Sequence, residues 1–76
     1  MGKRQIRIFR KKLLDHAFEL LQQPSVQLVL RNRVVLTGAL KQLSAESIKL
    51  LDLRSNFHTY TLEQVEEVIY DVESDY

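Results

Sequence analysis

The chain has 76 residues, of which 45% are hydrophobic and 28% are charged, and its net charge is +1. This length fits one domain, and this composition excludes a wholly disordered chain. The chain has no cysteine, and its two histidines lack metal-ligand spacing, so we expect no disulfide, no metal and no cofactor. A domain of this size buries only about 60% of its unfolded surface, so we expect self-association to supply the missing burial.

Residues 9–22 are predicted to form an amphipathic helix, which Pro24 ends. The apolar residues of this region fall within one arc of about 140° on a helical wheel. They are Ile6, Phe9, Leu13, Leu14, Ala17, Leu20 and Leu21. This stripe is expected to cover one side of a sheet. Residues 1–8, which precede the helix, are predicted to be a basic arm.

Five runs of β-branched and apolar residues follow Pro24 and predict five strands joined by short turns. They cover residues 26–31, 34–43, 47–53, 57–62 and 65–72. Asn32-Arg33 predicts the two-residue turn of the first hairpin. Gly38 predicts a bend or a close backbone approach in the second strand. The predicted fold is therefore mainly β, with an N-terminal α-helix followed by a strongly bent five-stranded antiparallel small barrel.

Charge is concentrated at the two ends of the chain. Residues 1–12 carry six cations and no acid, whereas residues 62–76 carry six acids and no base. The cations are Lys3, Arg4, Arg7, Arg10, Lys11 and Lys12. In one interpretation the two ends offset each other, within a subunit or between subunits. In the other, the basic arm binds a phosphate backbone. Residues 73–76 are expected to form an acidic tail.

Two classes of protein are not expected from this sequence. No serine, histidine and acid form a recognisable nucleophile motif, and no glycine-rich phosphate loop occurs, so we do not expect an enzyme. No apolar run approaches the length of a membrane span or of a signal-peptide core. We therefore expect a cytoplasmic protein with no membrane partner.

The segment 26–43 resembles the first motif of the Sm-like family, the group of LSm proteins and bacterial Hfq. Asn32 and Gly38 coincide with the asparagine and the strand glycine of that motif, and Leu40 coincides with its hydrophobic position. The departures are Arg33, Leu43 and Ser44, where the family has glycine, an aromatic residue and aspartate. The resemblance extends over residues 9–72, which it implies form a Sm-like domain with an SH3-type barrel.

The resemblance also implies a ring. Sm-like proteins form rings of five to seven subunits by pairing the fourth strand of one barrel with the fifth of the next, which removes exposed sheet edges. They bind single-stranded uridine-rich RNA at loops around the central pore, and some act as RNA chaperones. The corresponding loops here present Ser44, Glu46, Glu63 and Gln64. Two carboxylates per subunit, repeated around a ring, would repel phosphate.

We therefore expect a homo-oligomeric ring that binds RNA or single-stranded nucleic acid outside the pore, mainly through the basic arm. Four polar residues near predicted strand ends are further candidates: Arg31, Asn32, Arg33 and Arg54. Three nearby rings could stack on bases: Phe57, His58 and Tyr60. Packing in the core or between subunits is the alternative for these rings. The alternative function is a structural or scaffold ring that binds protein partners and has lost the family's RNA sites.

Overall fold

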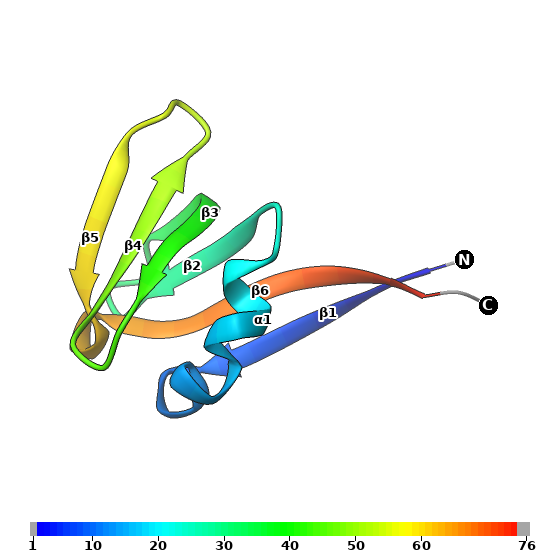
Figure 1. Ribbon diagram of the computed structural model, residues 1–76, viewed down its shortest axis with the longest axis horizontal. Coiled ribbons are helices and arrows are strands. Elements are labelled where there is room, and N and C mark those ends of the chain that lie inside the picture. The colour runs from blue at the N-terminus through cyan, green and yellow to red at the C-terminus, as the bar shows by residue number, and fades with distance from the viewer. Residues whose placement is uncertain (1, 75–76) are drawn as a thin grey trace.

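The computed structural model describes the backbone of residues 2–74 and the side chains of residues 4–72. Six strands form one antiparallel sheet in the order β1-β6-β2-β3-β4-β5 (Figure 1). The strands are β1 (Gly2–Phe9), β2 (Val26–Leu30), β3 (Val35–Leu43), β4 (Ser47–Asp52), β5 (Phe57–Thr61) and β6 (Val65–Ser74). The described helical elements are α1 (Ala17–Leu21) and three 3-10 turns, η1 (Arg10–Lys12), η2 (Leu14–His16) and η3 (Leu62–Gln64). The protein is therefore mainly β.

The N-terminal segment is a strand, and the prediction of one continuous helix over residues 9–22 was wrong. β1, which includes most of the segment predicted to be a basic arm, pairs with β6 through eight register positions. Ile8, which lies off the predicted helical stripe, is only 4% exposed, whereas Phe9 is 56% exposed. The burial of residues 6–9 therefore alternates with the period of two that is typical of a strand. Two 3-10 turns follow before the short helix α1 begins at Ala17.

The five strands predicted after Pro24 are confirmed as β2 to β6, each within two residues of its predicted bounds. With β1 the sheet has six strands rather than five. Among the described strands the sheet does not close into the expected barrel, because β1 and β5 remain its two edges. The outer backbone groups of both edge strands are therefore available to another strand.

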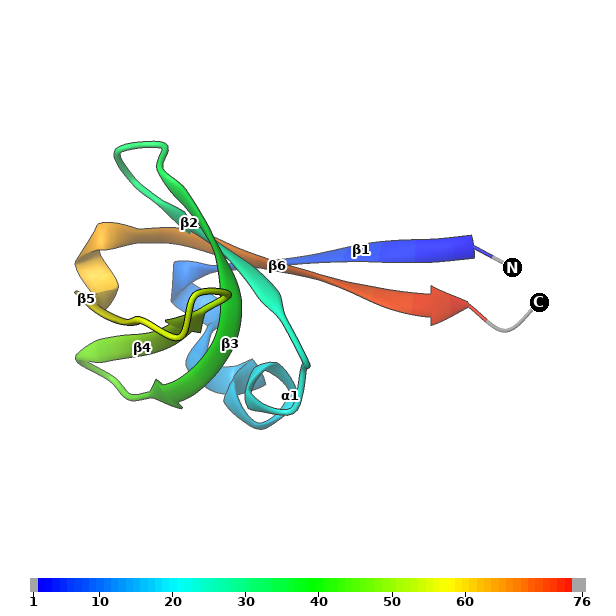
Figure 2. The same ribbon diagram turned by 90° about the horizontal axis from the view of Figure 1, so that it is seen from above.

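β3 curves strongly around the core, and Gly38 lies within it (Figure 2). This glycine pairs with Val26 on one side and with Asp52 on the other. A Cβ atom added at Gly38 would lie 2.1 Å from the carbonyl oxygen of Leu51, so a side chain would force β3 and β4 apart. The predicted close backbone approach at Gly38 is confirmed.

One hydrophobic core lies between the sheet and the helical segment 10–21. Leu13 and Leu20 project from that segment and are fully buried. The strands contribute Ile8, Val26, Leu28, Leu30, Leu40, Ile48, Leu50, Val65, Val68 and Tyr70. α1 packs against β3 (Figure 2). Leu14 and Leu21, which also belong to the predicted stripe, remain exposed.

β1 and β6 extend past the rest of the sheet as a two-stranded ribbon (Figures 1 and 2). At its base, Nη1 of Arg7 donates to Oε1 of Glu67 at 3.0 Å, and Glu67 is only 7% exposed. A carboxylate buried to this extent needs a charged partner, because desolvation of an isolated charge is costly. Arg7 is that partner. For this residue the structure favours the interpretation in which the two charged ends offset each other within a subunit.

A buried phenol connects the helix to β6. The hydroxyl of Tyr70 donates a hydrogen bond to the carboxylate of Glu19 in α1. Burial, and then this carboxylate, raise the pKa of Tyr70 to about 12. Nδ1 of His16 lies 3.5 Å from the same carboxylate. The helical segment is therefore attached to the strand that pairs with both β1 and β2.

The close approach at Gly38 can be tested by substitution. Gly38→Ala is expected to lower the free energy of unfolding by about 1–3 kcal/mol, because the added methyl group overlaps backbone atoms of β4. Urea denaturation followed by circular dichroism measures this change. Lys41→Ala, at an exposed position of the same strand, should change the value by less than about 0.5 kcal/mol. Equal stability of Gly38→Ala and the unmodified protein would contradict the assignment.

Candidate nucleic-acid interface

The structure distributes the predicted contact residues over four regions. β1 carries Lys3, Arg4 and Arg7; η1 carries Arg10, Lys11 and Lys12; the β2–β3 turn carries Arg31, Asn32 and Arg33; and the β4–β5 hairpin carries Arg54, Phe57, His58 and Tyr60. The side chain of Lys3 lies outside the described residues. Arg7 is bound to Glu67. Of the remaining regions, η1 and the β2–β3 turn each place one arginine against the same backbone atom.

The backbone atom that both arginines contact is the carbonyl oxygen of Glu63, in η3. Nη1 of Arg10 and Nη1 of Arg31 each donate to it at 3.3 Å. The two nitrogen atoms therefore lie no farther apart than twice that distance. The backbone N–H of Arg31 also donates to the carbonyl of Gln64 at 2.9 Å, which fixes the turn against η3. Pairing of β1 with β6 brings Arg10 to the same place.

These two guanidinium groups are like charges held close together. Neither forms an ion pair with a carboxylate of the described residues. A single carbonyl oxygen uses only part of the donor capacity of two arginines, since each guanidinium offers five N–H groups in a planar fork. The remaining donors match the geometry of a phosphate group.

A pocket of about 330 Å³ opens beside this arginine pair. It is lined by Leu30, Arg31, Asn32, Tyr60, Glu63 and Gln64. Its volume is at the lower end of the range for small-molecule sites. Three of the predicted contact residues, Arg31, Asn32 and Tyr60, therefore share one site. We call these six residues together with Arg10 the arginine pocket.

Two amide side chains of the arginine pocket are oriented by the backbone. Oδ1 of Asn32 accepts the N–H of Val34 at 3.1 Å, which stabilises the predicted turn. Oε1 of Gln64 accepts the N–H of Thr61 at 3.0 Å. Both carbonyl oxygens are thus used internally, and the NH₂ groups have no partner among the described residues. Such NH₂ groups can donate to the carbonyl oxygens of a base.

The three candidate rings have different roles. Tyr60 packs partly against the core and lines the arginine pocket. His58 lies parallel to Tyr60, with ring centroids 6.5 Å apart, and its Nε2 lies 2.7 Å from Oδ2 of Asp52. Phe57 is exposed on the other face, 5.7 Å from Nζ of Lys49. His58 is therefore held by its contact with Asp52, and of the three rings Tyr60 alone lines the arginine pocket.

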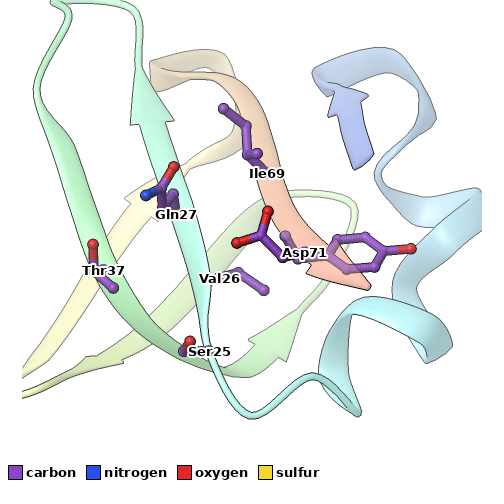
Figure 3. Close-up of a pocket in the computed structure, with 7 residues that line it drawn as sticks. Ser25, Val26, Gln27, Thr37, Ile69 and Asp71 are labelled. Atoms are coloured by element: carbon purple, nitrogen blue, oxygen red, sulfur yellow. The ribbon is translucent and has the colours of Figure 1, made fainter. Parts of the chain in front are cut away.

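The loops that the family resemblance places at the pore form a separate depression of about 340 Å³. It is lined by Ala45, Glu46, Thr61, Leu62 and Glu63, with two carboxylates and no base. A third, smaller depression of about 80 Å³ lies where β2 and β6 diverge (Figure 3). Asp71 and Gln27 line it without any arginine or lysine. Neither depression suits a phosphate group.

Sequence reasoning did not include Gln64 among the contacts. The spacing of Thr61 and Gln64 is that of a capping box, and the structure contains both hydrogen bonds of that motif. This pattern could have located η3 and the direction of the Gln64 side chain. No local sequence pattern indicates that Arg10 and Arg31 lie close together, because their proximity depends on the pairing of β1 with β6, which come from opposite ends of the chain.

Comparisons with protein-family models, with curated proteins and with solved structures find no match. Among the described residues, no helix combines the length and the apolar character needed to cross a membrane. The same residues contain no cluster of three or more histidine or acidic side chains that could hold a metal ion. The arginine pocket therefore has to be interpreted from its own chemistry.

Asp52 organises the hairpin that carries His58 and Tyr60. It accepts the backbone N–H groups of Asn56 at 2.9 Å and Arg54 at 2.8 Å, in addition to its contact with His58. The hydrogen bond from Asn56, and next that from His58, hold the pKa of Asp52 below its ordinary value of 3.8. The ionised carboxylate therefore stabilises the folded state above that pH. This contribution is lost as the pH falls through the lowered pKa.

Asp52→Asn is accordingly expected to melt at a lower temperature than the unmodified protein at pH 7. The difference should shrink as the pH falls below about 3.8, where the carboxylate of the unfolded chain begins to bind a proton, and should be gone below the lowered pKa, where the carboxylate of the folded protein is protonated as well. Thermal denaturation at several pH values measures this. Asp15→Asn, which changes an exposed carboxylate, serves as the control. A difference between Asp52→Asn and the unmodified protein that is constant with pH would contradict the assignment.

Proposed function

We propose that this protein binds single-stranded nucleic acid, and RNA in the first instance, as a homo-oligomeric ring of five to seven Sm-like subunits. The observation that carries the proposal is the pair of arginines, Arg10 and Arg31, held at one carbonyl oxygen without an acidic partner among the described residues. A phosphate group between them would satisfy the remaining N–H donors and reduce their mutual repulsion.

The rest of the arginine pocket suits a base attached to that phosphate. Tyr60 offers a ring for stacking, which is worth ~1–3 kcal/mol per base in single-strand binding sites. The NH₂ groups of Asn32 and Gln64 can donate to base carbonyl oxygens, of which uracil has two. Stacking and charge contacts tolerate many sequences. We therefore expect only a modest preference for nucleotide sequence, with uridine-rich oligonucleotides bound most tightly.

A ring would multiply these contacts. Each subunit adds one arginine pocket, so a strand that leaves one pocket can be held by the next. The exposed cations Lys11, Lys12 and Arg33 lie on the two elements that carry the arginine pair. They would extend the positive surface along a bound strand.

A scaffold that binds proteins is the second candidate, and a different observation favours it. Leu14, Phe18 and Leu21 follow one another at helical spacing and are 48%, 79% and 39% exposed. An exposed apolar stripe of this kind commonly marks a protein interface. Pull-down after nuclease treatment tests this function. Loss of all captured protein on nuclease treatment would contradict it.

Fluorescence anisotropy with a labelled uridine-rich oligonucleotide tests the proposed nucleic-acid binding. Binding is expected at about 50 mM salt and should weaken strongly at about 200 mM. Arg31→Gln should weaken binding about tenfold, equal to ~1.4 kcal/mol, and lower the slope against log salt by about 1. Lys41→Gln removes the same charge from an exposed position that lines none of the pockets described here, and should change binding less than about twofold. No binding of the unmodified protein at low salt would contradict the proposal.

The carboxylate of Glu63 lines the arginine pocket and should oppose phosphate. Glu63→Gln keeps the backbone carbonyl that holds both arginines and removes only this charge. Binding of the same oligonucleotide should tighten about two- to fivefold, because removing a like charge near a surface is worth ~0.5–1 kcal/mol. Asp71→Asn, which removes an exposed carboxylate outside the arginine pocket, is the matched control. Weaker binding of the oligonucleotide by Glu63→Gln would mean that the nucleic acid does not bind at the arginine pocket.

A further inference from the structure

β5 is an unusually unprotected sheet edge. Its sequence, Phe-His-Thr-Tyr-Thr, has no charged residue and no proline, and its pairing with β4 runs from Ser47–Thr61 to Leu51–Phe57 without a bulge. Natural proteins block exposed edges with lysine, proline, bulges or covering segments. None of the first three devices occurs in β5, and no described strand pairs with its outer side. This edge is suited to pairing with another strand.

The strand available for this pairing in a second copy is β1. The family resemblance implies pairing between β5 of one subunit and β6 of the next. However, Glu67, Val68 and Ile69 of β6 already pair with β1 on one side and with β2 on the other. β1 covers that edge of β6 and presents its own outer edge instead. The two edges of each sheet, β1 and β5, are therefore the two ends that copies of this chain can join.

The faces of the two edge strands also match. Phe9 of β1 and Phe57 of β5 are both exposed on the face directed away from the core, because their neighbours Ile8 and His58 point the other way. An antiparallel register with Phe9 opposite Phe57 makes a cross-strand aromatic pair of two exposed rings. The same register places Ile6 opposite Tyr60.

We infer that β5 of one subunit pairs antiparallel with β1 of the next, head to tail, in the register that joins Phe57 to Phe9. Such a heterologous contact continues the sheet from subunit to subunit and closes a ring when the rotation between copies permits. In this register the pairing ends with the partner's Gln5 opposite Thr61, so the partner's Arg4 lies just past the end of β5, beside η3 and the arginine pocket. Within its own chain Arg4 lies on the ribbon, exposed and without an ion pair among the described residues. This contribution of Arg4 rests on the proposed function.

Cysteine cross-linking tests the interface directly, because the chain has no cysteine of its own. The double variant Phe9→Cys/Phe57→Cys should form a ladder of covalent species under mild oxidation, seen on a non-reducing gel. Each single variant should stay uncross-linked, and a mixture of the two single variants should give covalent dimers only. Val35→Cys/Phe57→Cys, with its first cysteine on the exposed face of β3, should give no ladder.

Two outcomes would overturn the interface. Efficient dimers of Phe57→Cys alone would mean that β5 pairs with β5, and no ladder from the folded double variant would mean that β5 and β1 do not meet. Light scattering on the unmodified protein gives a check that is independent of any variant. A mass of several subunits supports the interface, whereas a single subunit at micromolar concentration overturns it.

The role of Arg4 has a separate measurement. In the assembled protein, Arg4→Gln should weaken oligonucleotide binding about as much as Arg31→Gln does. Ladder formation with unchanged binding of Arg4→Gln would overturn the contribution of Arg4 and leave the interface standing. Failure of the ladder with normal binding by the unmodified protein would overturn the interface and leave the proposed function standing.

Discussion

The pairing of β1 with β6 is the interaction on which the rest of the structure depends. It joins residues from the two ends of the chain through eight register positions and buries Ile8 opposite Val68. It also supplies Arg7 to the buried carboxylate of Glu67. For a domain this small, with no disulfide, a long non-local strand pair contributes a large part of the available burial.

This pairing also divides the N-terminal cations into two sets. Arg7 neutralises the buried carboxylate of Glu67 in β6. Arg10, which directly follows β1, donates instead to the backbone carbonyl of Glu63, where Arg31 donates as well. β1 pairs with the side of β6 that an Sm-like ring would use for contact between subunits. The exposed edge at this end of the sheet is therefore β1 rather than β6. The proposed binding site and the proposed assembly therefore have one structural origin.

The sequence predicted the parts of the fold that depend on neighbours in the chain. Runs of β-branched residues located β2 to β6, and Gly38 located the close approach of β3 and β4. The N-terminal segment was assigned wrongly because Ile6 and Phe9 fit a helical stripe as well as Ile6 and Ile8 fit a strand. Only the presence of β6, from the other end of the chain, decides between the two periods. For the same reason the sequence could indicate candidate contact residues but not which of them lie together in space. Arg31, Asn32 and Tyr60 share the arginine pocket, whereas Arg54 and Phe57 do not line it.

The most direct test of this account is amide hydrogen exchange of the unmodified protein, followed residue by residue by NMR. If β1 pairs with β6, at least every second amide of residues 2–9 should exchange slowly, at rates comparable with those of the partner residues in β6. Exchange of all these amides at the rate of an unstructured peptide, while β2 to β6 stay protected, would contradict the account.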